Sequence, residues 1–503
     1  MSYAELENHF RTLGHLEHVA SIMHWDEAVM MPVAAGPARA EAMASLQVVL
    51  HGYRTDPRLG DWLSRAEDDR GNLDPFQQAN LREMRREVTR ARGVPPSLVA
   101  REAEVCMRCE QAWRTLRAEN NWDAFAPLLA EVLTIKREVA QALGQALDMS
   151  PYDALMDAFE PGVRAERVDT IFADLRGFLP GFIDEVAALQ AGQPAPVEPP
   201  GPFAVEAQRR LGAELMSAVG FDMDHGRLDV SHHPFCGGVP TDVRITTRYD
   251  ESDFSRALMG VLHETGHAKY EQSLPGNWLG QPVGRARGMS LHEGHSLLQE
   301  MQVSRGLPFL RFAAPRIAKA FPQAAAARAD AFTPENLHRL YTRVARTWIR
   351  VDADEVTYPC HVMLRYEIER DLIAGRMQVT DIPEAWDAGM HKLLGIHTGT
   401  DYRNGCMQDI HWAGGAFGYF PTYTLGAMTA AQLFAAAYKA LPTLLDDIAQ
   451  GRFDGLNSFL ALQVGAEGSR LTTDEMLSKV SGEPLNPEYF RRHLRARYVE
   501  QRG

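Results

Sequence analysis

Two histidines that flank a glutamate carry the strongest chemical signal in the sequence. His263 and His267 are four residues apart in L-H-E-T-G-H-A (262–268). On an α-helix this spacing places both imidazoles on one face, about 5–6 Å apart, where they can bind one tetrahedral metal ion. Glu264 lies roughly 100° further round the helix, where it can act as a general base toward an attacking water. The motif predicts a metal-dependent hydrolase; the alternative is two hydrogen-bonded histidines on a buried helix.

A catalytic zinc ion also needs a third protein ligand and an open position. After a Pro- and Gly-rich break at 275–288, the stretch M-S-L-H-E-G-H (289–295) offers Glu293 between His292 and His295. A break of this length lets a second helix fold back and present a carboxylate to the first. Two histidines and a later glutamate are the ligand set of one class of zinc peptidases. From spacing alone, His292 and His295 remain competitors for the third place.

The first motif lies in a predicted helix that follows a predicted strand. Residues 242–249, D-V-R-I-T-T-R-Y, alternate apolar and polar side chains and are rich in β-branched ones, which is typical of a strand. Ser252 or Asp253 can cap a helix that then runs without proline as far as Pro275. Apolar residues recur at helical spacing elsewhere, as in 129–143 and 172–189. The chain is therefore expected to be mainly helical.

Charge and apolar runs limit the possible functions. The 503-residue chain has a net charge of -14, with 45% hydrophobic and 23% charged residues. An acidic chain is poorly suited to bind nucleic acid or an anionic membrane. The N-terminus lacks the features of a secretory signal, and no apolar run approaches the ~20 residues of a membrane helix. We expect a cytoplasmic protein without nucleic-acid or membrane partners.

The five cysteines, at positions 106, 109, 236, 360 and 406, suit a reducing compartment and form no disulfide framework. Only Cys106 and Cys109 are close in sequence. A C-x-x-C pair can bind metal or carry redox chemistry, but this pair lies in a helix-like stretch with no second pair nearby. We expect its role to be structural.

Six ordered motifs make the sequence similar to the carboxypeptidase Taq family of metallocarboxypeptidases. The similarity begins near residue 20, at A-S-I-M-H-W-D-E, and covers essentially the whole chain. The motifs are His233-Pro234-Phe235, Asp242-x-Arg244-x-Thr246, the zinc helix His263 to His267, His292-Glu293-Gly294-His295, Ile349-Arg350-x-x-Ala353-Asp354, and Gly405-x-x-Gln408-Asp409-x-His411-Trp412.

The resemblance implies a fold, an activity and a ligand set. It implies a mainly α-helical, two-lobed zincin-type peptidase with a deep active-site cleft and a small β-strand element at the cleft edge. It also implies that Glu293 is the third zinc ligand, with cobalt or another divalent ion possible, and that the substrates are peptides with a free C-terminus. Broad specificity, poor action on C-terminal proline and a homodimer follow in the same way. Residues 1–503 then form one domain, with a possible loop or hinge at 190–203.

His295 departs from the family pattern, which has glutamine at this position. The ligand Glu293 is unchanged, so we expect metal binding to survive. Imidazole and amide can both donate a hydrogen bond, so a mild effect on substrate fit or metal preference is expected rather than loss of function.

The later motifs supply candidates for substrate recognition. A guanidinium grips both oxygens of a terminal carboxylate, and Arg350, with Asp352 and Asp354 to orient it, is the candidate; a structural ion pair is the alternative. His411 can donate to an oxyanion or to the substrate carboxylate, and Asp409 can fix the geometry of its neighbour.

Aromatic and strand residues are weaker candidates. Tyr419 and Tyr423 can supply phenolic donors, although aromatic residues beside glycine and proline often only pack. The strand that carries Arg244 can border the cleft and hydrogen-bond an extended peptide, while Arg244 itself is as easily structural.

Two other functions fit parts of this pattern. A zinc oligoendopeptidase or dipeptidase shares the metal core and differs only in lacking the carboxylate clamp. An inactive metal-bound peptide-binding scaffold is disfavoured because a structural zinc has no use for Glu264. No G-x-S-x-G elbow, P-loop or dinucleotide glycine pattern indicates another chemistry.

Overall fold

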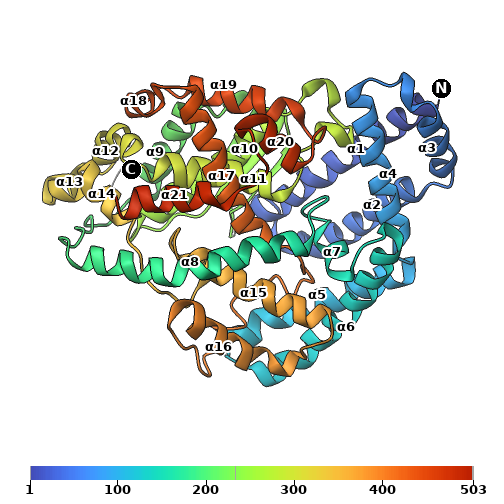
Figure 1. The fold of residues 1–503 in the computed structure, drawn as a ribbon, viewed down its shortest axis with the longest axis horizontal. Coiled ribbons are helices and arrows are strands. Elements are labelled where there is room, and N and C mark those ends of the chain that lie inside the picture. Colours follow the sequence, from blue (N-terminus) through green and yellow to red (C-terminus); the bar gives the residue numbers. More distant parts are fainter. Residues whose placement is uncertain (1, 233, 501–503) are drawn as a thin grey trace.

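The computed structural model describes residues 2–232 and 234–500 as a mainly α-helical protein with one small sheet (Figure 1). This confirms the fold class expected from the sequence. His233 of the H-P-F motif lies outside the described residues. Within the described part of the chain, no helix is both long and apolar enough to cross a membrane.

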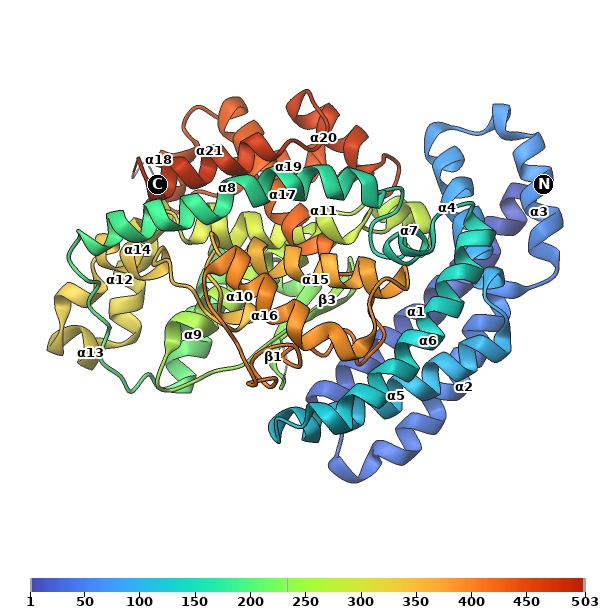
Figure 2. The same ribbon diagram turned by 60° about the horizontal axis from the view of Figure 1, so that its bottom comes forward.

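The first helices lie together on one side of the molecule (Figure 2). They are α1 (Ser2–Val29), α2 (Gly36–Thr55), α3 (Arg58–Asp68), α4 (Pro75–Gly93), α5 (Pro96–Ala118) and α6 (Trp122–Leu147). Apolar side chains of α1 to α4 form a small core of their own, separate from the main core of the protein. Cys106 and Cys109 lie on α5, where burial raises the pKa of both thiols. Both sulfurs are thus held as uncharged thiols, which fits the structural role expected for the pair.

The remaining helices form the larger part of the molecule around the main core. They are α7 (Pro151–Met156), α8 (Ala165–Ala191), α9 (Val205–Ala218), α10 (Phe254–Gln272), α11 (Met289–Leu297), α12 (Leu307–Ala320), α13 (Pro322–Ala327), α14 (Pro334–Tyr341), α15 (Tyr358–Ile373), α16 (Ile382–Leu394), α17 (Pro421–Ala440), α18 (Leu444–Ala449), α19 (Asp454–Gln463), α20 (Thr473–Ser481) and α21 (Pro487–Tyr498). The Pro-rich stretch after α8 contains no helix, as predicted.

The sheet has three strands, β1 (Gly226–Val230), β2 (Cys236–Val239) and β3 (Asp242–Thr247), in the order β1-β3-β2. β3 is parallel to β1 and antiparallel to β2. The predicted strand is therefore present, but it is the central one, and its main chain is paired on both sides. The expectation that this strand hydrogen-bonds an extended peptide is wrong, because only β1 and β2 have a free edge.

The two motif helices form where the sequence predicts them. Asp253 caps α10 by accepting a hydrogen bond of 2.8 Å from the Ser255 amide. α10 then ends at Gln272, and α11 begins at Met289 after the predicted break.

Glycines bring three helices unusually close together at the second motif. A Cβ on Gly266 of α10 would lie 2.5 Å from the His295 main-chain oxygen of α11. A Cβ on Gly294 would lie 2.7 Å from Thr429 of α17, and one on Gly426 of α17 would lie 2.7 Å from the Glu293 Cβ. Any larger residue at these positions would push the helices apart. The glycines therefore determine how near Glu293 comes to α10.

A π-helical segment, η6 (Leu298–Ser304), continues α11 and is held by the C-terminal helix. Arg497 of α21 donates to the Met301 carbonyl at 2.5 Å and to the Gln302 carbonyl at 3.4 Å. Its guanidinium is also 3.1 Å from Glu355, which accepts a further bond of 2.7 Å from His493. This buried network joins α21 to η6, the segment that continues α11.

Loss of Glu355 is expected to destabilise the protein in a pH-dependent manner. Burial alone would raise the pKa of Glu355, but His493 and Arg497 outweigh it and hold the pKa well below its ordinary 4.5. We expect Glu355→Gln to lower the free energy of unfolding by about 3–5 kcal/mol at neutral pH, because Arg497 loses its charged partner. Because the folded-state pKa of Glu355 is lowered, its contribution to the free energy of unfolding is present above pH 4.5 and is lost as the pH falls below that value.

Denaturant unfolding of wild type and Glu355→Gln across the acid range measures this effect. The difference between the two proteins should shrink as the solution is acidified. Glu335→Gln, which changes an exposed glutamate, is the control and should show little difference at any pH. A wild-type to Glu355→Gln difference that stays constant down to strongly acid pH would contradict the expectation.

Candidate metal centre and substrate site

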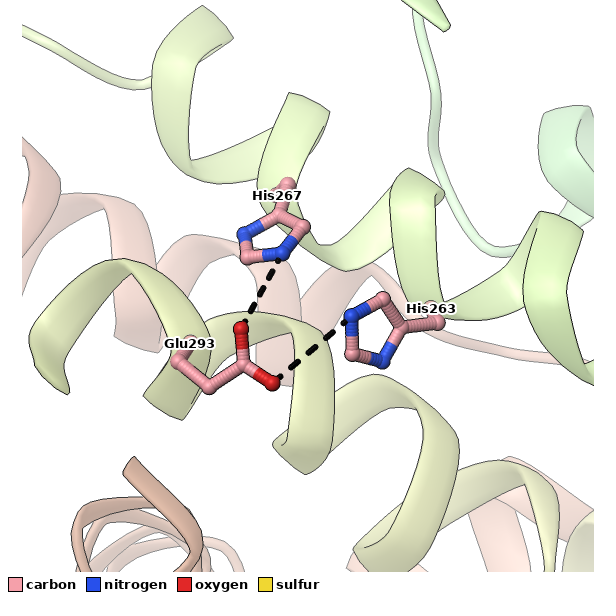
Figure 3. A group of neighbouring side chains, drawn as sticks. All are labelled: His263, His267 and Glu293. Atoms are coloured by element: carbon pink, nitrogen blue, oxygen red, sulfur yellow. Dashed lines mark ion pairs between the residues drawn. The ribbon is translucent and has the colours of Figure 1, made fainter. Parts of the chain in front are cut away.

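Three predicted ligands meet between α10 and α11 (Figure 3). The Nε2 atom of His263 lies 3.8 Å from one carboxylate oxygen of Glu293, and the Nε2 atom of His267 lies 3.4 Å from the other. One ligand atom from each residue lies within 4.8 Å of the others, and among the described residues only this group of three does so. A tetrahedral zinc site with bonds near 2.0–2.1 Å needs ligand atoms roughly 3.3 Å apart, so a small closing movement suffices.

Outer partners leave the Nε2 atoms of both histidines available to a metal. His263 Nδ1 lies 2.9 Å from Glu300, and His267 Nδ1 lies 2.6 Å from His292 Nδ1. His292 Nε2 is in turn 2.8 Å from Glu271. When His263 Nδ1–H donates to Glu300 and His267 Nδ1–H donates to His292, the Nε2 atoms of His263 and His267 both face Glu293 and could offer their lone pairs to a metal ion. This is the arrangement that outer partners impose on metal-binding histidines.

The local electrostatics favour a cation at the cluster. Burial opposes protonation of His263, but Glu293 and Glu300 outweigh it and raise its pKa to about 10. Burial lowers the pKa of His267 to about 4, which keeps that ring neutral. Glu293 and Glu300 thus stabilise a positive charge in the cluster. A divalent metal ion would supply such a charge. The residues therefore fit a metal ion.

Glu264 is buried beside this cluster and is not one of the three ligands. Burial raises its pKa to about 7, and Glu293 adds to the effect while His263 opposes it. A carboxyl group that titrates near neutrality can accept and release a proton at physiological pH.

His295 points away from the cluster. Two residues beyond Glu293 on α11, it is turned roughly 200° round the helix. Its ring stacks on Tyr270, with centroids 4.0 Å apart and planes 2° from parallel. Its Nδ1 donates to the Leu291 carbonyl at 2.8 Å. The position at which the chain departs from the family pattern therefore faces another part of the protein.

His292 is expected to strengthen metal binding although it lies outside the ligand set. We expect His292→Leu to weaken metal retention by roughly 10- to 100-fold, because His267 loses the acceptor that orients it. Metal content after dialysis against a graded chelator series measures the effect. His397→Leu, which changes an exposed imidazole paired with Asp387, is the control. Equal metal retention in the two variants would contradict this role for His292.

A second buried cluster contains Arg350. Its Nε and one terminal nitrogen donate to the same oxygen of Asp409, at 3.0 and 2.7 Å, and its other terminal nitrogen donates to the Tyr358 hydroxyl. Arg365 donates to the second oxygen of Asp409 at 2.6 Å. Two guanidinium groups therefore share one carboxylate. Three bonds leave two of the five N–H groups of Arg350 for a further acceptor.

The expected partners of Arg350 were wrong. Asp354 instead accepts hydrogen bonds from the backbone and hydroxyl of Thr357, and Asp352 pairs with Arg256 at the surface. Asp409 takes their place, from a segment 59 residues further along the chain. Asp409 is 3.9 Å from His411 Nδ1, too far for a hydrogen bond, so the two arginines rather than His411 are its partners.

Two tyrosines, Tyr419 and Tyr423, are close enough to both clusters for their pKa values to respond to Arg350 and to Glu293. Tyr423 lies beneath the Arg350 guanidinium, 4.9 Å from ring centroid to Cζ, and its hydroxyl is 3.3 Å from His411 Nε2. Burial raises the pKa of Tyr419 and Tyr423, and the charge of Glu293 adds to this. Burial and Arg350 lower the pKa of His411 to about 4. These side chains are therefore uncharged hydrogen-bonding groups near Arg350.

Arg244 is not brought to the metal cluster. Val243 and Ile245 of β3 pack with Val261 and Ala268 of α10, so the intervening Arg244 lies on the opposite face of the sheet. Its guanidinium forms two bonds to Asp242 and lies 4.2 Å from the Trp25 ring centroid. These contacts fit the structural alternative, in which Arg244 ties the sheet to α1.

Sequence reasoning missed several residues around these clusters: Glu300, Glu271, Arg365 and Tyr358. Glu300 was detectable, since it follows Glu293 by seven residues, which is two helical turns. Glu271 follows His267 by four residues, which is one turn. Arg365 had no such signal, because its partner Asp409 lies in a distant segment. Tyr358 follows its partner Arg350 by eight residues, but the two do not share a helix.

Comparisons with known proteins agree along the whole chain. The family described as Carboxypeptidase Taq (M32) metallopeptidase matches residues 5–498. Thermostable carboxypeptidase 1 from Thermus thermophilus is 38% identical over 100% of this chain and 99% of that protein. Trypanosoma cruzi metallocarboxypeptidase 1 is 43% identical with a TM-score of 0.96, and the structure covers 99% of both chains. An M32 carboxypeptidase from Deinococcus radiodurans R1 is 32% identical with a TM-score of 0.93, again over 99% of both chains.

Proposed function

The chain belongs to the carboxypeptidase Taq (M32) metallopeptidase family, and we propose that it removes single amino acids from peptide C-termini with zinc as its metal. The observation that carries this proposal is the pairing of a three-ligand cluster with a buried guanidinium that has donors to spare. The first can activate water, and the second can hold a terminal carboxylate.

His263, His267 and Glu293 would hold the metal, with cobalt or another divalent ion as an alternative to zinc. A divalent ion at this place supplies Lewis acidity that polarises the scissile carbonyl and acidifies the attacking water. Glu300 and His292 keep the imidazoles oriented so that each Nε2 faces the site.

Glu264 acts as the general base. It takes a proton from the attacking water and passes that proton to the departing amine, which its pKa near neutrality allows. His411, Tyr419 and Tyr423 are neutral donors that stabilise the developing oxyanion or the end of the substrate.

Arg350 binds the C-terminal carboxylate of the peptide. Asp409 neutralises only one of the two guanidinium groups that contact it, so this cluster has a surplus positive charge. Buried charges are ordinarily paired, and a substrate carboxylate would complete the pairing. Asp409 is then a residue that positions Arg350 rather than a group that touches substrate.

This carboxylate clamp favours a carboxypeptidase over an internal oligopeptidase. An endopeptidase has no use for a buried guanidinium with spare donors. The buried Glu264 disfavours an inactive metal-bound scaffold. Broad specificity, weak action on C-terminal proline, a cytoplasmic location, a homodimer and a single 1–503 domain with a hinge at 190–203 are further proposals that rest on family resemblance and sequence.

Mass spectrometry of a peptide mixture tests the proposal. Each peptide is supplied with a free and with an amidated C-terminus, with and without a chelator. We expect stepwise loss of single residues from free C-termini only, and no loss after chelation. Internal cuts or dipeptide release from both forms would instead support an oligopeptidase or dipeptidase, and no cleavage of any peptide would support a scaffold.

A further inference from the structure

One face of α15 carries polar side chains that contact the candidate substrate site. Tyr358, Arg365 and Glu369 are seven and four residues apart, which places them on the same face of this helix. The first two contact Arg350 and Asp409, as described above. Glu369 lies one turn beyond Arg365 and is 0% exposed, so its carboxyl group meets only groups of the protein. Its role is therefore defined by its hydrogen-bond partners.

Glu369 accepts three hydrogen bonds, two of them from the ends of the loop 412–418. Trp412 Nε1 donates to one carboxyl oxygen at 2.9 Å, and the Gly418 main-chain N–H donates to the other at 3.0 Å. The hydroxyl of Tyr152, on α7, lies 2.8 Å from the second oxygen. Burial raises the pKa of Glu369 to about 7. An indole N–H and a main-chain N–H can only donate, so both oxygens must accept whether or not the group is charged.

Both ends of this loop adjoin candidate substrate groups. His411 immediately precedes Trp412, and Tyr419 immediately follows Gly418. The rings of His411 and Tyr419 lie together, with their centroids 5.6 Å apart. In the described part of the chain, no side chain other than Glu369 accepts a hydrogen bond from this loop or donates one to it. The position of the two candidate groups therefore depends on this one carboxyl group.

We propose that Glu369 is a positioning residue that holds both ends of this loop and so keeps His411 and Tyr419 where they can donate to the transition state. The inference rests on the proposed function, in which these two residues are neutral donors. Donors stabilise a developing oxyanion well only if they are already in place when it forms. A displacement of about 1 Å can cost roughly 100-fold in rate, so Glu369 affects catalysis without touching the substrate.

Glu369→Gln releases one end of the loop with almost no change in side-chain size. An amide has a single acceptor oxygen, so it can accept from Trp412 or from Gly418 and turns its own N–H groups toward the other. We expect kcat on peptides with a free C-terminus to fall by roughly tenfold or more, and KM to stay within about threefold, because the displaced donors act in the transition state. Metal content should not change, since the partners of Glu369 include none of the three metal ligands.

Tyr152→Phe is the matched control for this variant. It removes the third hydrogen bond to the same carboxyl group and leaves both ends of the loop bound. Both variants should lose some stability in denaturant unfolding, since each breaks a buried hydrogen bond, but Tyr152→Phe should keep kcat within about twofold of wild type.

Amide hydrogen exchange followed by mass spectrometry gives a measurement that does not depend on activity. The fragment that contains the loop 412–418 should exchange faster than wild type in Glu369→Gln and at the wild-type rate in Tyr152→Phe. Unchanged exchange of this fragment in Glu369→Gln would overturn the proposal.

The activity measurements separate failure of this inference from failure of the proposed function. If the wild-type protein cleaves free C-termini and Glu369→Gln keeps the wild-type kcat, the inference is wrong and the proposed function stands. An equal loss of kcat in Glu369→Gln and Tyr152→Phe would make Glu369 merely structural. If the wild-type protein cleaves no peptide, the proposed function fails, and the exchange rates alone decide whether Glu369 anchors the loop.

A second variant applies if Glu369→Gln does not fold. Trp412→Phe removes only the donor beside His411. It should also lower kcat by roughly tenfold or more. A wild-type kcat in Trp412→Phe would refute the proposal.

Discussion

Glu264→Gln is expected to lower kcat by roughly 10³-fold, within the usual range for loss of a general base. The amide retains the size of the carboxylate but cannot accept the proton of the attacking water. Since Glu264 is not one of the three clustered ligands, metal content should stay at the wild-type value. Steady-state hydrolysis of a chromogenic peptide and elemental analysis of the same sample measure the two quantities.

The exposed Glu251, which precedes α10, provides the matched control. Glu251→Gln makes the same chemical change outside the site and should retain full activity. If the kcat of Glu264→Gln remained within a few-fold of the wild-type value, Glu264 would not be the general base. The same conclusion would follow if the variant lost its metal together with its activity.

Arg350→Gln is expected to reduce kcat/KM by roughly 100-fold or more for peptides with a free C-terminus. Removing one partner of a buried charged contact costs about 2–5 kcal/mol, and each 1.4 kcal/mol is a factor of ten. Amidated peptides cannot use the clamp, so their slow cleavage should change far less. Asp409 keeps Arg365 as a partner, which should preserve the local fold.

Arg256→Gln is the control, because this surface arginine, also paired with an aspartate, is 75% exposed at its side chain. It should leave both classes of peptide unaffected. An equal loss on free and amidated peptides in Arg350→Gln would show that Arg350 is structural and would favour an oligopeptidase.

The metal motif and its helices could be predicted because both depend on local sequence. Asp253 caps α10, the two histidines are one turn apart, and the break before Met289 lets α11 fold back beside α10. Glu293 as third ligand came from family resemblance. The structure explains it through Gly294 and Gly426, which let this side chain approach α10.

Contacts between distant segments could not be predicted in the same way. Asp352 and Asp354 are near Arg350 in sequence, but Asp352 pairs with Arg256 at the surface and Asp354 accepts hydrogen bonds from Thr357. The partner of Arg350, Asp409, comes from another loop. Strand order is equally non-local: alternation identifies β3 as a strand but does not say that β1 and β2 pair on either side of it. The direction of His295 follows from helical geometry, yet its stacking partner, Tyr270, comes from α10.

Anomalous diffraction at the zinc absorption edge, from crystals of the zinc-loaded protein, tests the central proposal most directly. We expect one strong peak bounded by the Nε2 atoms of His263 and His267 and the carboxylate of Glu293. The peak should be absent in Glu293→Gln crystals grown in the same way. A peak beside His292 and Glu271, beside His295, or at Cys106 and Cys109 with none between α10 and α11 would contradict it.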